Sequence, residues 1–556
     1  MSSKSTPRRR RRMSVQFLLI LIAISTIFGL LTTDLRSIEP SPKVEMRKGE
    51  FSADTTSDKV EMRKEEFSAD TTSDKVEAAE GGKKCATVEE MGQIFSRGYV
   101  GESLRVRRLI RHHFADNGAS RVRNLPPEQF CNRGFVIGKA SEAGLGNELY
   151  KLLTAAALSV MLNRSLIIGQ TRDKYPFGDY ISYSNVTFTL KEVKHLWRQN
   201  RCLTKYKRHL TMRIDDFQKP SRTAVLCSNW REWEQPIIWF QNATDAVAAQ
   251  FFLKNIHPEM REAATDLFGK PENLQYRANV FGEIMRILIS PSKDVENAVS
   301  WALSGGRDPD IVLHMRMMMN RPVRAKQAAV DCLRKALLNL PMISRPKVVL
   351  VSDTPSVVNN IARTLKEFAE VLHFDYEKFQ GNISGNSNII NFRRKDWGPA
   401  PRWVAFVDFF LASRAKHVVI SGAHRRVGTT YAQLIAALAA AYRLDENSSL
   451  NSSITFLSSF QGSLLSEGLK RQIGWGHVWN RFAGPLSCRG QHSQCALTPL
   501  LPPAWWDGLW QSPIPRDVQR MEAYGIKLSG FGTSDDTHLR GFCQSRKNSV
   551  VVARLI

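Results

Sequence analysis

The sequence lacks the markers of a nucleic-acid-binding protein, although its composition is strongly basic. It has 556 residues, with 78 lysines and arginines against 53 aspartates and glutamates, and a formal net charge of +25. The basic residues are spread along the chain, and neither a zinc-finger spacing nor an RNA-binding signature is present. We therefore expect no nucleic-acid partner; the charge suits a membrane surface or an acidic ligand instead. The length is sufficient for about two to four domains.

A signal-peptide cleavage site is also missing where one would be expected. The run from Val15 to Leu31 carries no charge and reaches the short end of the length that spans a bilayer as a helix. Five arginines, at 8–12, precede it, and positive flanks stay cytoplasmic. No A-x-A site follows the run, which favours an uncleaved signal anchor over a cleaved signal peptide. We predict a cytoplasmic tail (1–12), a transmembrane signal anchor (13–33) and a lumenal remainder, which makes a single-pass type II membrane protein.

No cysteine precedes the predicted lumenal part. All eight cysteines lie beyond the anchor, where an oxidising compartment permits disulfides. Their pairing cannot be deduced from the sequence; Cys488 and Cys495 are close enough for a local pair, and two free surface thiols are the alternative. N-x-S/T sequons, which predict a glycoprotein, also lie beyond the anchor, at Asn163, Asn185, Asn242, Asn382, Asn447 and Asn451.

A tandem repeat follows the anchor. Residues 43–58 (KVEMRKGEFSADTTSD) and 59–74 (KVEMRKEEFSADTTSD) differ only at Gly49 and Glu65. Each copy carries one phenylalanine and one methionine among many charges, so the copies cannot bury enough apolar surface to offset chain entropy. We predict that residues 34–84 form a disordered stem between the membrane and the globular part.

Beyond the stem, short apolar runs alternate with longer helical patterns. The clearest predicted strands are 164–169, 310–316, 347–353 and 416–422, and the clearest helices are 147–163 and 430–444. This alternation predicts an α/β fold with two parallel sheets. We expect an N-terminal α/β domain (85–292), a C-terminal α/β domain (293–485) and an extension (486–556) that wraps the domains or caps them.

Polar and cationic side chains follow the predicted strands. Ligands of open α/β sheets bind beyond the carboxyl ends of the strands, and there the chain places His314, Arg316, Asp353, Ser421, Arg425 and Arg426. Gly146 and Asn147 open the helix in the first half, and a glycine-containing helix start with nearby arginines suits a diphosphate. Simpler interpretations remain open for each residue taken singly: a helix-start turn for the glycine, a solvated side chain for the arginines and a helix cap for Asp353.

The triplet Asp308-Pro309-Asp310 needs separate treatment because a D-x-D triplet can hold a divalent metal on a nucleotide-sugar diphosphate. Here it precedes a strand, which is the wrong end of the sheet for the predicted cleft. We interpret it as a turn into the strand, and we expect neither a metal nor a cofactor.

The order of these segments resembles the GDP-fucose-dependent fucosyltransferase superfamily, which includes plant xyloglucan fucosyltransferases, N-glycan core α1,6-fucosyltransferases and protein O-fucosyltransferases. The matching segments, between about 140 and 440, are GLGNELYKLLTAAALSVMLNRSLII, HMR, VLVSDTPSVV and DFFLASRAKHVVISG. The resemblance implies two facing Rossmann-like domains of the GT-B type, with GDP-fucose between them and no required metal. It implies that the first domain (85–292) is the acceptor side and that the second (293–485) holds the donor nucleotide. It implies that Arg316 pairs with the diphosphate, His314 lies near the guanosine, Asp353 contacts the guanine or ribose and Ser421 lies by the phosphates. Gly146 and Asn147 would approach the donor from the first domain.

Two departures from the family pattern concern catalysis. The second basic residue that often follows H-x-R is replaced by Met317, and Arg425 or Arg426 could supply the missing charge. The glutamate that serves as base in core α1,6-type members is absent around Arg324, so the base remains unassigned.

We therefore expect a Golgi-membrane glycosyltransferase that moves fucose from GDP-fucose to a glycan or glycoprotein by metal-independent inversion, with Arg316 as the catalytic residue. A non-catalytic glycan-binding or scaffolding protein of the same fold is the alternative, and a transferase for another sugar nucleotide is a third. The acceptor is not readable from the sequence, and a homodimer is compatible with it.

Overall fold

The structure is a computed structural model, and it describes residues 99–140, 144–170, 175–205, 208–217, 219–220, 223–242, 252–270, 277–317, 322–338, 345–383, 400–421, 429–444, 454–461, 493–498, 500–501, 515–530, 533–546 and 551–556. The predicted tail, anchor and stem, together with Arg425 and Arg426, lie outside these residues. Within them, no helix is long and apolar enough to cross a membrane. The chain divides into two compact units, 1–82 and 83–556, and all described residues belong to the second.

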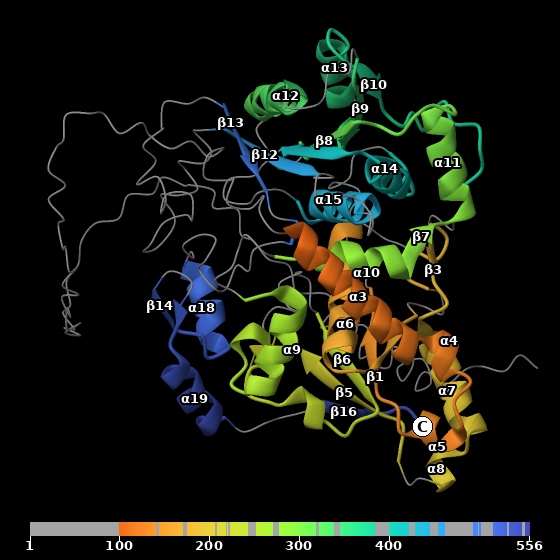
Figure 1. Ribbon diagram of the computed structural model, residues 1–556, viewed down its shortest axis with the longest axis vertical. Helices are drawn as coiled ribbons and strands as arrows, with labels where there is room; N and C mark the ends of the chain where they lie inside the picture. The colour runs from red at the N-terminus through yellow and green to blue at the C-terminus, as the bar shows by residue number, and fades with distance from the viewer. Residues whose placement is uncertain are drawn as a thin grey trace, which may run out of the picture. The chain divides into compact units, whose positions relative to one another are not determined.

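The second unit is built on two mixed sheets with helices packed around them (Figure 1). The first sheet has the order β16-β5-β6-β1-β2-β4, and all its strands are parallel except β16. Its strands are β1 (Phe135–Gly138), β2 (Ser165–Ile168), β4 (Phe188–Thr189), β5 (Thr211–Asp216), β6 (Ile237–Gln241) and β16 (Val551–Arg554).

The second sheet has the order β10-β9-β8-β11-β12-β13, and only β13 is antiparallel. Its strands are β8 (Ile311–Met315), β9 (Lys347–Ser352), β10 (Glu370–Leu372), β11 (His417–Ser421), β12 (Thr455–Gln461) and β13 (Ser493–Leu497). Two short ribbons complete the strands: β3 (Ile181–Tyr183) with β7 (Ile289–Pro291), and β14 (Leu528–Gly530) with β15 (Thr533–Ser534).

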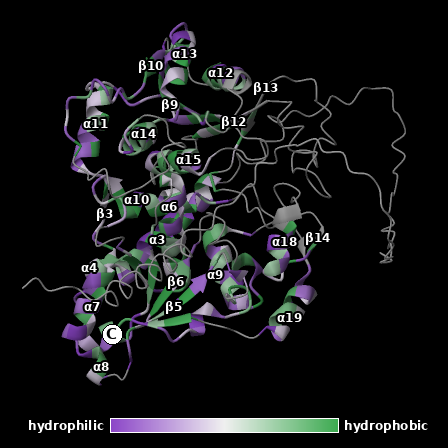
Figure 2. Ribbon diagram, turned by 180° about the vertical axis from the view of Figure 1, so that it is seen from behind, coloured by the Kyte–Doolittle hydropathy of each residue, from purple (hydrophilic) through white to green (hydrophobic). Residues whose placement is uncertain are grey.

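The predicted α/β class and the four predicted strands are confirmed. The strands are apolar runs because their faces are covered by helices: every residue of β8 is buried, and the ribbons of both sheets are largely hydrophobic (Figure 2). The sequence pattern did not predict β1, which precedes the helix that starts at 145, because its four residues, FVIG, are too few to display a period.

Four helices form a layer shared by the two sheets: α3 (Tyr99–Asn117), α6 (Leu145–Met161), α10 (Val280–Leu288) and α15 (Thr430–Arg443). Helix α15 is buried on nearly all sides because it packs on α6 and α10 as well as on β11. One continuous hydrophobic cluster therefore runs from Val136 of the first sheet to Val418 of the second.

The remaining helices lie on the other faces of the sheets, beside the shared layer and near the chain ends. They are α4 (Ala119–Val122), α5 (Pro127–Cys131), α7 (Leu190–Gln199), α8 (Cys202–Lys205), α9 (Pro258–Phe268), α11 (Lys293–Leu303), α12 (Pro322–Leu338), α13 (Pro355–Leu365), α14 (Val404–Ala412), α18 (Pro515–Ala523) and α19 (Asp536–Ser545), with one 3₁₀ turn, η3 (Trp230–Glu232).

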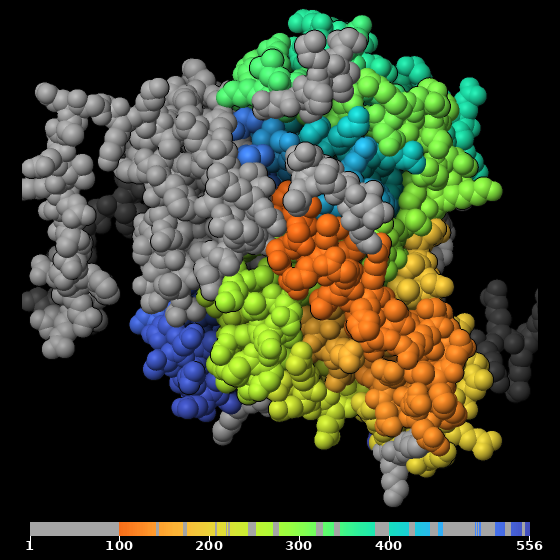
Figure 3. Space-filling view, viewed as in Figure 1, coloured from red at the N-terminus to blue at the C-terminus, as the bar shows by residue number. Residues whose placement is uncertain are grey.

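The C-terminal extension is an integral part of both sheets. Strand β13 closes one edge of the second sheet and β16 closes one edge of the first. The region of α18 and α19 lies against the first sheet's side of the molecule (Figure 3), where the Tyr524 hydroxyl donates to the Phe217 carbonyl and the two rings are 5.3 Å apart. The extension therefore completes the fold.

Three disulfides are described, and they correct one sequence expectation. Cys495 of β13 pairs with Cys332 of α12, so it is neither free nor bonded to Cys488, which lies outside the described residues. The second disulfide joins Cys131 to Cys202. The long sequence separation within each pair is the reason that the sequence could not reveal the partners.

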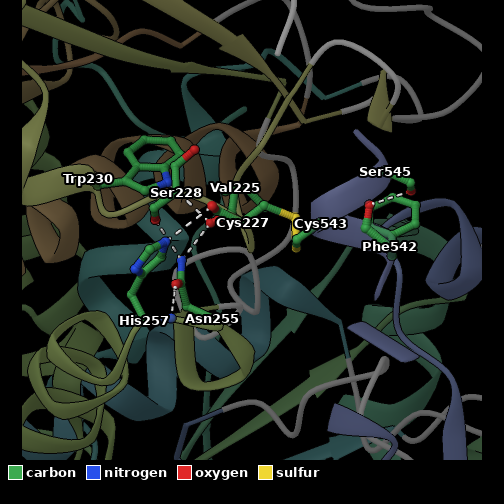
Figure 4. Close-up of a disulfide and its surroundings, with 9 residues drawn as sticks. All are labelled: Val225, Cys227, Ser228, Trp230, Asn255, His257, Phe542, Cys543 and Ser545. Carbon is green, nitrogen blue, oxygen red and sulfur yellow. Dashed lines mark hydrogen bonds between the residues drawn. A yellow bond between two sulfur atoms is a disulfide. The ribbon is translucent and has the colours of Figure 1, made fainter. Parts of the chain in front are cut away.

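The third disulfide, Cys227–Cys543, ties α19 to a loop of the first half (Figure 4). Buried Asn255 holds that loop: its side-chain amide donates to the carbonyl oxygens of Val225 (2.8 Å) and Ser228 (3.0 Å). The backbone is thus hydrogen-bonded on both sides of the disulfide that attaches α19.

A buried arginine joins the helices of the two halves. Arg107 of α3 forms a two-pronged ion pair with Glu283 of α10, at 2.6 and 2.9 Å. Its guanidinium also donates to the carbonyls of Ala441 (2.8 Å) and Leu444 (2.6 Å) at the end of α15. Both charged side chains are about 1% exposed. The arginine thus satisfies helix-terminal carbonyls that have no partner within the helix.

We predict that Arg107→Met lowers the free energy of unfolding by about 3–5 kcal/mol, because it leaves the Glu283 carboxylate buried without its partner. Chemical denaturation measures the change. Replacing both residues, as in Arg107→Met with Glu283→Leu, should recover part of the loss. Arg105→Met is the matched control, since Arg105 is half-exposed and its pair with Glu102 contributes at most about 1 kcal/mol. Equal losses for the two single variants would contradict the role assigned to Arg107.

Candidate functional site

The carboxyl ends of three adjacent strands bring together residues that are far apart in the sequence. The backbone N–H of Arg316, just after β8, donates to Ser421 Oγ at the end of β11 (3.1 Å). Its guanidinium Nη1 lies 3.1 Å from Oδ2 of Asp353, just after β9. Because β8 lies between β9 and β11, these three residues meet at one edge of the sheet, as the sequence predicted.

Asp353 is engaged on both carboxylate oxygens. Oδ2 pairs with Arg316, while Oδ1 accepts from the Met317 backbone N–H (2.8 Å) and from the Thr354 hydroxyl (3.3 Å). The cap residue of α13 is Thr354, so the helix-cap interpretation of Asp353 does not apply. The carboxylate is nearly buried and therefore holds the arginine and the turn after β8 in one geometry.

His314 points into the same region from β8. It is 5% exposed, its ring centroid lies 5.5 Å from that of Tyr431, and its Nδ1 has no hydrogen-bond partner among the described residues. Burial lowers the pKa of His314 to about 4, and the charge of Arg316 adds to this while Asp353 opposes it. The imidazole is therefore neutral at physiological pH.

Asp408 of α14 is a residue that sequence reasoning did not include in the site. Burial raises the pKa of its carboxyl group to about 8, although part of the side chain remains accessible, and it has no hydrogen-bond partner within the described part of the chain. It neighbours Tyr431, whose hydroxyl donates to the Ala405 carbonyl (2.6 Å). The available signal was the single carboxylate in the otherwise apolar helix VAFVDFFLA.

Gly146 and Asn147 lie where the first turn of α6 meets the first turn of α15. A Cβ at Gly146 would come within 2.6 Å of the Tyr431 backbone nitrogen, and the Thr430 hydroxyl donates to Asn147 Oδ1 (2.9 Å). The residue at 146 must therefore be glycine for the helices to touch. The positive ends of two helix dipoles converge here, and the N-cap of α6, Gly144, offers no side-chain cap.

The comparisons with known proteins place this arrangement in a family. A family model described as a family of unknown function, DUF7810, matches residues 80–555. The chain belongs to DUF7810. No curated protein matches it.

Several solved structures show a remote likeness to this DUF7810 chain. Arabidopsis thaliana FUT1 in complex with GDP is 12% identical, with a TM-score of 0.39 over 65% of this chain and 78% of that one. The fucosyltransferase NodZ from Bradyrhizobium is 14% identical, with a TM-score of 0.33 over 55% and 92%. POFUT1 in complex with GDP-fucose is 10% identical, with a TM-score of 0.30 over 58% and 98%.

The D-x-D triplet of this DUF7810 chain lies at the opposite, N-terminal edge of the second sheet. Asp310 is fully buried; it pairs with Lys416 (3.0 Å) and Arg307 (3.2 Å) and accepts from the Lys347 backbone N–H (2.9 Å). Its position before β8 agrees with the turn expected there, and its contacts bind β8, β9 and β11 together. No cluster of three potential metal ligands occurs among the described residues.

We predict that Gly146→Ala lowers the free energy of unfolding by about 1–3 kcal/mol, because the added methyl group forces α6 away from the backbone of α15. Thermal or chemical unfolding measures it. Gly101→Ala in α3 is the control: nothing lies within 4 Å of its added Cβ, so alanine should be neutral or stabilise the helix by up to about 1 kcal/mol. A neutral Gly146→Ala would show that the close approach of the two helices is not required.

Proposed function

We propose that this DUF7810 chain is a glycosyltransferase that moves fucose from GDP-fucose to a hydroxyl group of a glycan or glycoprotein. One observation carries the proposal: an arginine at the carboxyl end of a central parallel strand, held in place by a buried carboxylate and by the adjacent strand. A fixed guanidinium at a strand end is suited to a diphosphate, and so are the two helix N-termini that converge at Gly146. The family resemblance of the motifs supports the choice of donor.

In this proposal Arg316 carries the catalytic role. The bond from the anomeric carbon to the GDP oxygen breaks while the acceptor oxygen bonds to the same carbon from the opposite face, which inverts the configuration. Negative charge develops on the diphosphate, and Arg316 stabilises it without a metal. Ser421 and the helix starts at Gly146 and Asn147 lie on the phosphate side; Arg425 and Arg426 remain proposed phosphate contacts.

Asp353 takes a different role from the one that the resemblance implies. Both of its oxygens are engaged by the chain itself, so we assign it to positioning Arg316 rather than to contact with the guanine or ribose. The acceptor proton leaves to a base that is not assigned.

We propose that the nucleobase contacts Asp408, whose side chain is partly accessible. Guanine presents a ring N–H and an amino group side by side. These two donors match the carboxylate of Asp408, which accepts no hydrogen bond from the described residues. Uracil does not offer two adjacent donors, so Asp408 favours a guanine nucleotide over a uridine nucleotide. His314, neutral because of its burial, packs near Tyr431, which in turn neighbours Asp408.

The cellular setting is proposed from the sequence. A signal anchor at 13–33 and a stem at 34–84 would hold the catalytic unit on the lumenal side of the Golgi membrane as a type II protein, where sugar nucleotides meet glycans. Fractionation of cells that express the tagged full chain would test the Golgi location. Protection of its C-terminus from protease added to sealed vesicles would test the orientation.

A non-catalytic glycan-binding protein of the same fold is the second candidate, because the base is unassigned and Met317 stands where a second basic residue is often found. A thermal-shift comparison of GDP-fucose, GDP-mannose and UDP-sugars, followed by measurement of GDP release with mixed acceptors, separates the candidates. Binding of GDP-fucose without transfer favours the second; no binding of any sugar nucleotide contradicts the first.

We predict that Arg316→Ala reduces transfer by about 10²–10³-fold, or about 3–4 kcal/mol of barrier, with folding retained. Arg316→Lys should remain strongly impaired, because lysine keeps the charge but loses the fork that pairs with Asp353. Initial rates of GDP release measure both. Transfer by Arg316→Ala near the wild-type rate would contradict the assignment.

We predict that GDP binding at pH 7 releases a proton from Asp408. With a pKa of about 8, the free carboxyl group is about nine-tenths protonated at pH 7, and it must ionise to accept two hydrogen bonds. Affinity should therefore rise with pH up to about 8. Calorimetry in phosphate and Tris, whose ionisation enthalpies differ, counts the released protons.

The Asp408→Asn variant should release no proton and should bind GDP more weakly. The control is Asp375→Asn, whose ion-pair partner Lys378 is exposed, and it should change neither proton release nor GDP affinity. Proton release that persists in Asp408→Asn would reject this role.

A further inference from the structure

Helix α7 carries a row of cations along one face. Lys191, Lys194 and Arg198 are spaced by three and four residues, so they lie on one side of the helix about one turn apart. His195 extends the row, and Arg201 continues it past the helix end. The ribbon of α7 is mostly hydrophilic (Figure 2). All of these side chains are exposed except that of Lys194, which is half-exposed.

The cations of this row have no partners within the described part of the chain. No ion pair or side-chain hydrogen bond involves Lys191, Lys194, Arg198 or Arg201. The acidic residue on the helix, Glu192, is already used: it accepts from Arg123 and closes the capping box with Thr189.

Some exposed cations elsewhere in the fold are paired, as in Lys378–Asp375, Arg121–Asp116 and Lys205–Glu128. Like charges one turn apart repel and destabilise a helix. The row on α7 therefore has a cost in the free protein that an anionic partner would remove.

The rest of α7 is held rigidly. Val193 and Trp197 are fully buried on its opposite face, the capping box closes its start, and the Cys131–Cys202 disulfide follows its end. A row that is fixed before binding loses little conformational entropy when a ligand arrives. The helix thus offers a preorganised line of positive charge.

The row begins at the carboxyl edge of the first sheet, the edge at which α6 also starts. Helix α7 follows directly from the carboxyl end of β4, which is parallel to β2 and so to β1. Helix α6, whose first turn meets α15, also starts beyond the carboxyl end of β1. Lys191 is thus the residue of the row nearest this edge, and the row leads away from it.

We propose that the row on α7 binds an anionic polysaccharide, a chain of sugars bearing carboxylates such as uronates, and that this polymer is the acceptor class of the enzyme. The assignment of this polymer as the acceptor rests on the proposed transferase function. A single line of charges along one helix matches a linear polymer, in which carboxylates repeat along one direction. Anionic lipids face mainly the cytoplasmic side of a membrane, and the proposed topology places α7 on the other side, so a membrane surface is the less suitable partner.

The test uses the full chain in neutral detergent, with labelled polygalacturonate as the probe and its fully methyl-esterified form as the neutral ligand. The variant carries Lys194→Gln, Arg198→Gln and Arg201→Gln. The matched control carries Arg363→Gln, Lys366→Gln and Arg540→Gln, which remove the same charge from exposed positions on other helices.

We predict that the α7 variant loses at least tenfold in affinity for polygalacturonate while the control changes less than twofold. The slope of log affinity against log salt should fall by roughly 2, because fewer counterions are released on binding. Wild-type affinity for the methyl ester should be far weaker. GDP binding should be the same in all three proteins, because the row is separate from the donor site.

Four results would overturn the proposal. Three are no polygalacturonate binding by the wild type, equal affinity in the α7 variant and the control, and equal binding of the methyl ester. The fourth is an α7 variant that no longer binds phosphatidylserine vesicles but still binds polygalacturonate, which would assign the row to a membrane. If binding depends on α7 but the chain takes up no GDP-fucose, the polysaccharide site stands and the transferase function fails.

Discussion

The contact between Arg107 and the end of α15 governs the geometry of the second unit. One guanidinium, withdrawn from water, satisfies a carboxylate of α10 and two terminal carbonyls of α15 at once. Asn279 adds a second tie, since its amide donates to the Ala437 carbonyl (2.7 Å). A helix that belongs by sequence to the second sheet is thereby fixed to helices of the first. Polar groups buried this deeply tolerate few alternative arrangements, because any shift leaves one of them without a partner.

The candidate site depends on that placement. The far end of α15 supplies Thr430 and Tyr431, which meet Gly146 and Asn147 of α6 and face His314. The second sheet contributes Arg316 from β8, its central strand. Because the helix is held at both ends, the strand ends and the two helix starts keep a fixed relation. A site that stabilises charge by preorganised groups requires such rigidity.

Much of the fold could be predicted from local pattern. The runs at 311–315, 347–352 and 417–421 are strands as expected, and their order placed Arg316, Asp353 and Ser421 at one edge. The pattern failed where an element was short or a partner distant. Strand β1 has four residues, Cys495 pairs with Cys332 across 163 positions, and the C-terminal extension supplies an edge strand to each sheet. Periodicity reports which side of an element is buried but not what buries it.

The candidate site, too, was determined partly by local sequence and partly by tertiary packing. The sequence by itself determined which residue types stand at the strand ends, and hence that a cationic, hydrogen-bonding rim exists. Only the tertiary structure decided their roles: it engaged both oxygens of Asp353, turned Gly146 toward α15, and withdrew His314 and Asp408 from water so that their pKa values move in opposite directions. The physical reason is that hydrogen-bond partners and solvation are set by neighbours in space. The amino-acid sequence specifies which chemical groups the site contains, and the tertiary packing specifies the environment in which each group acts.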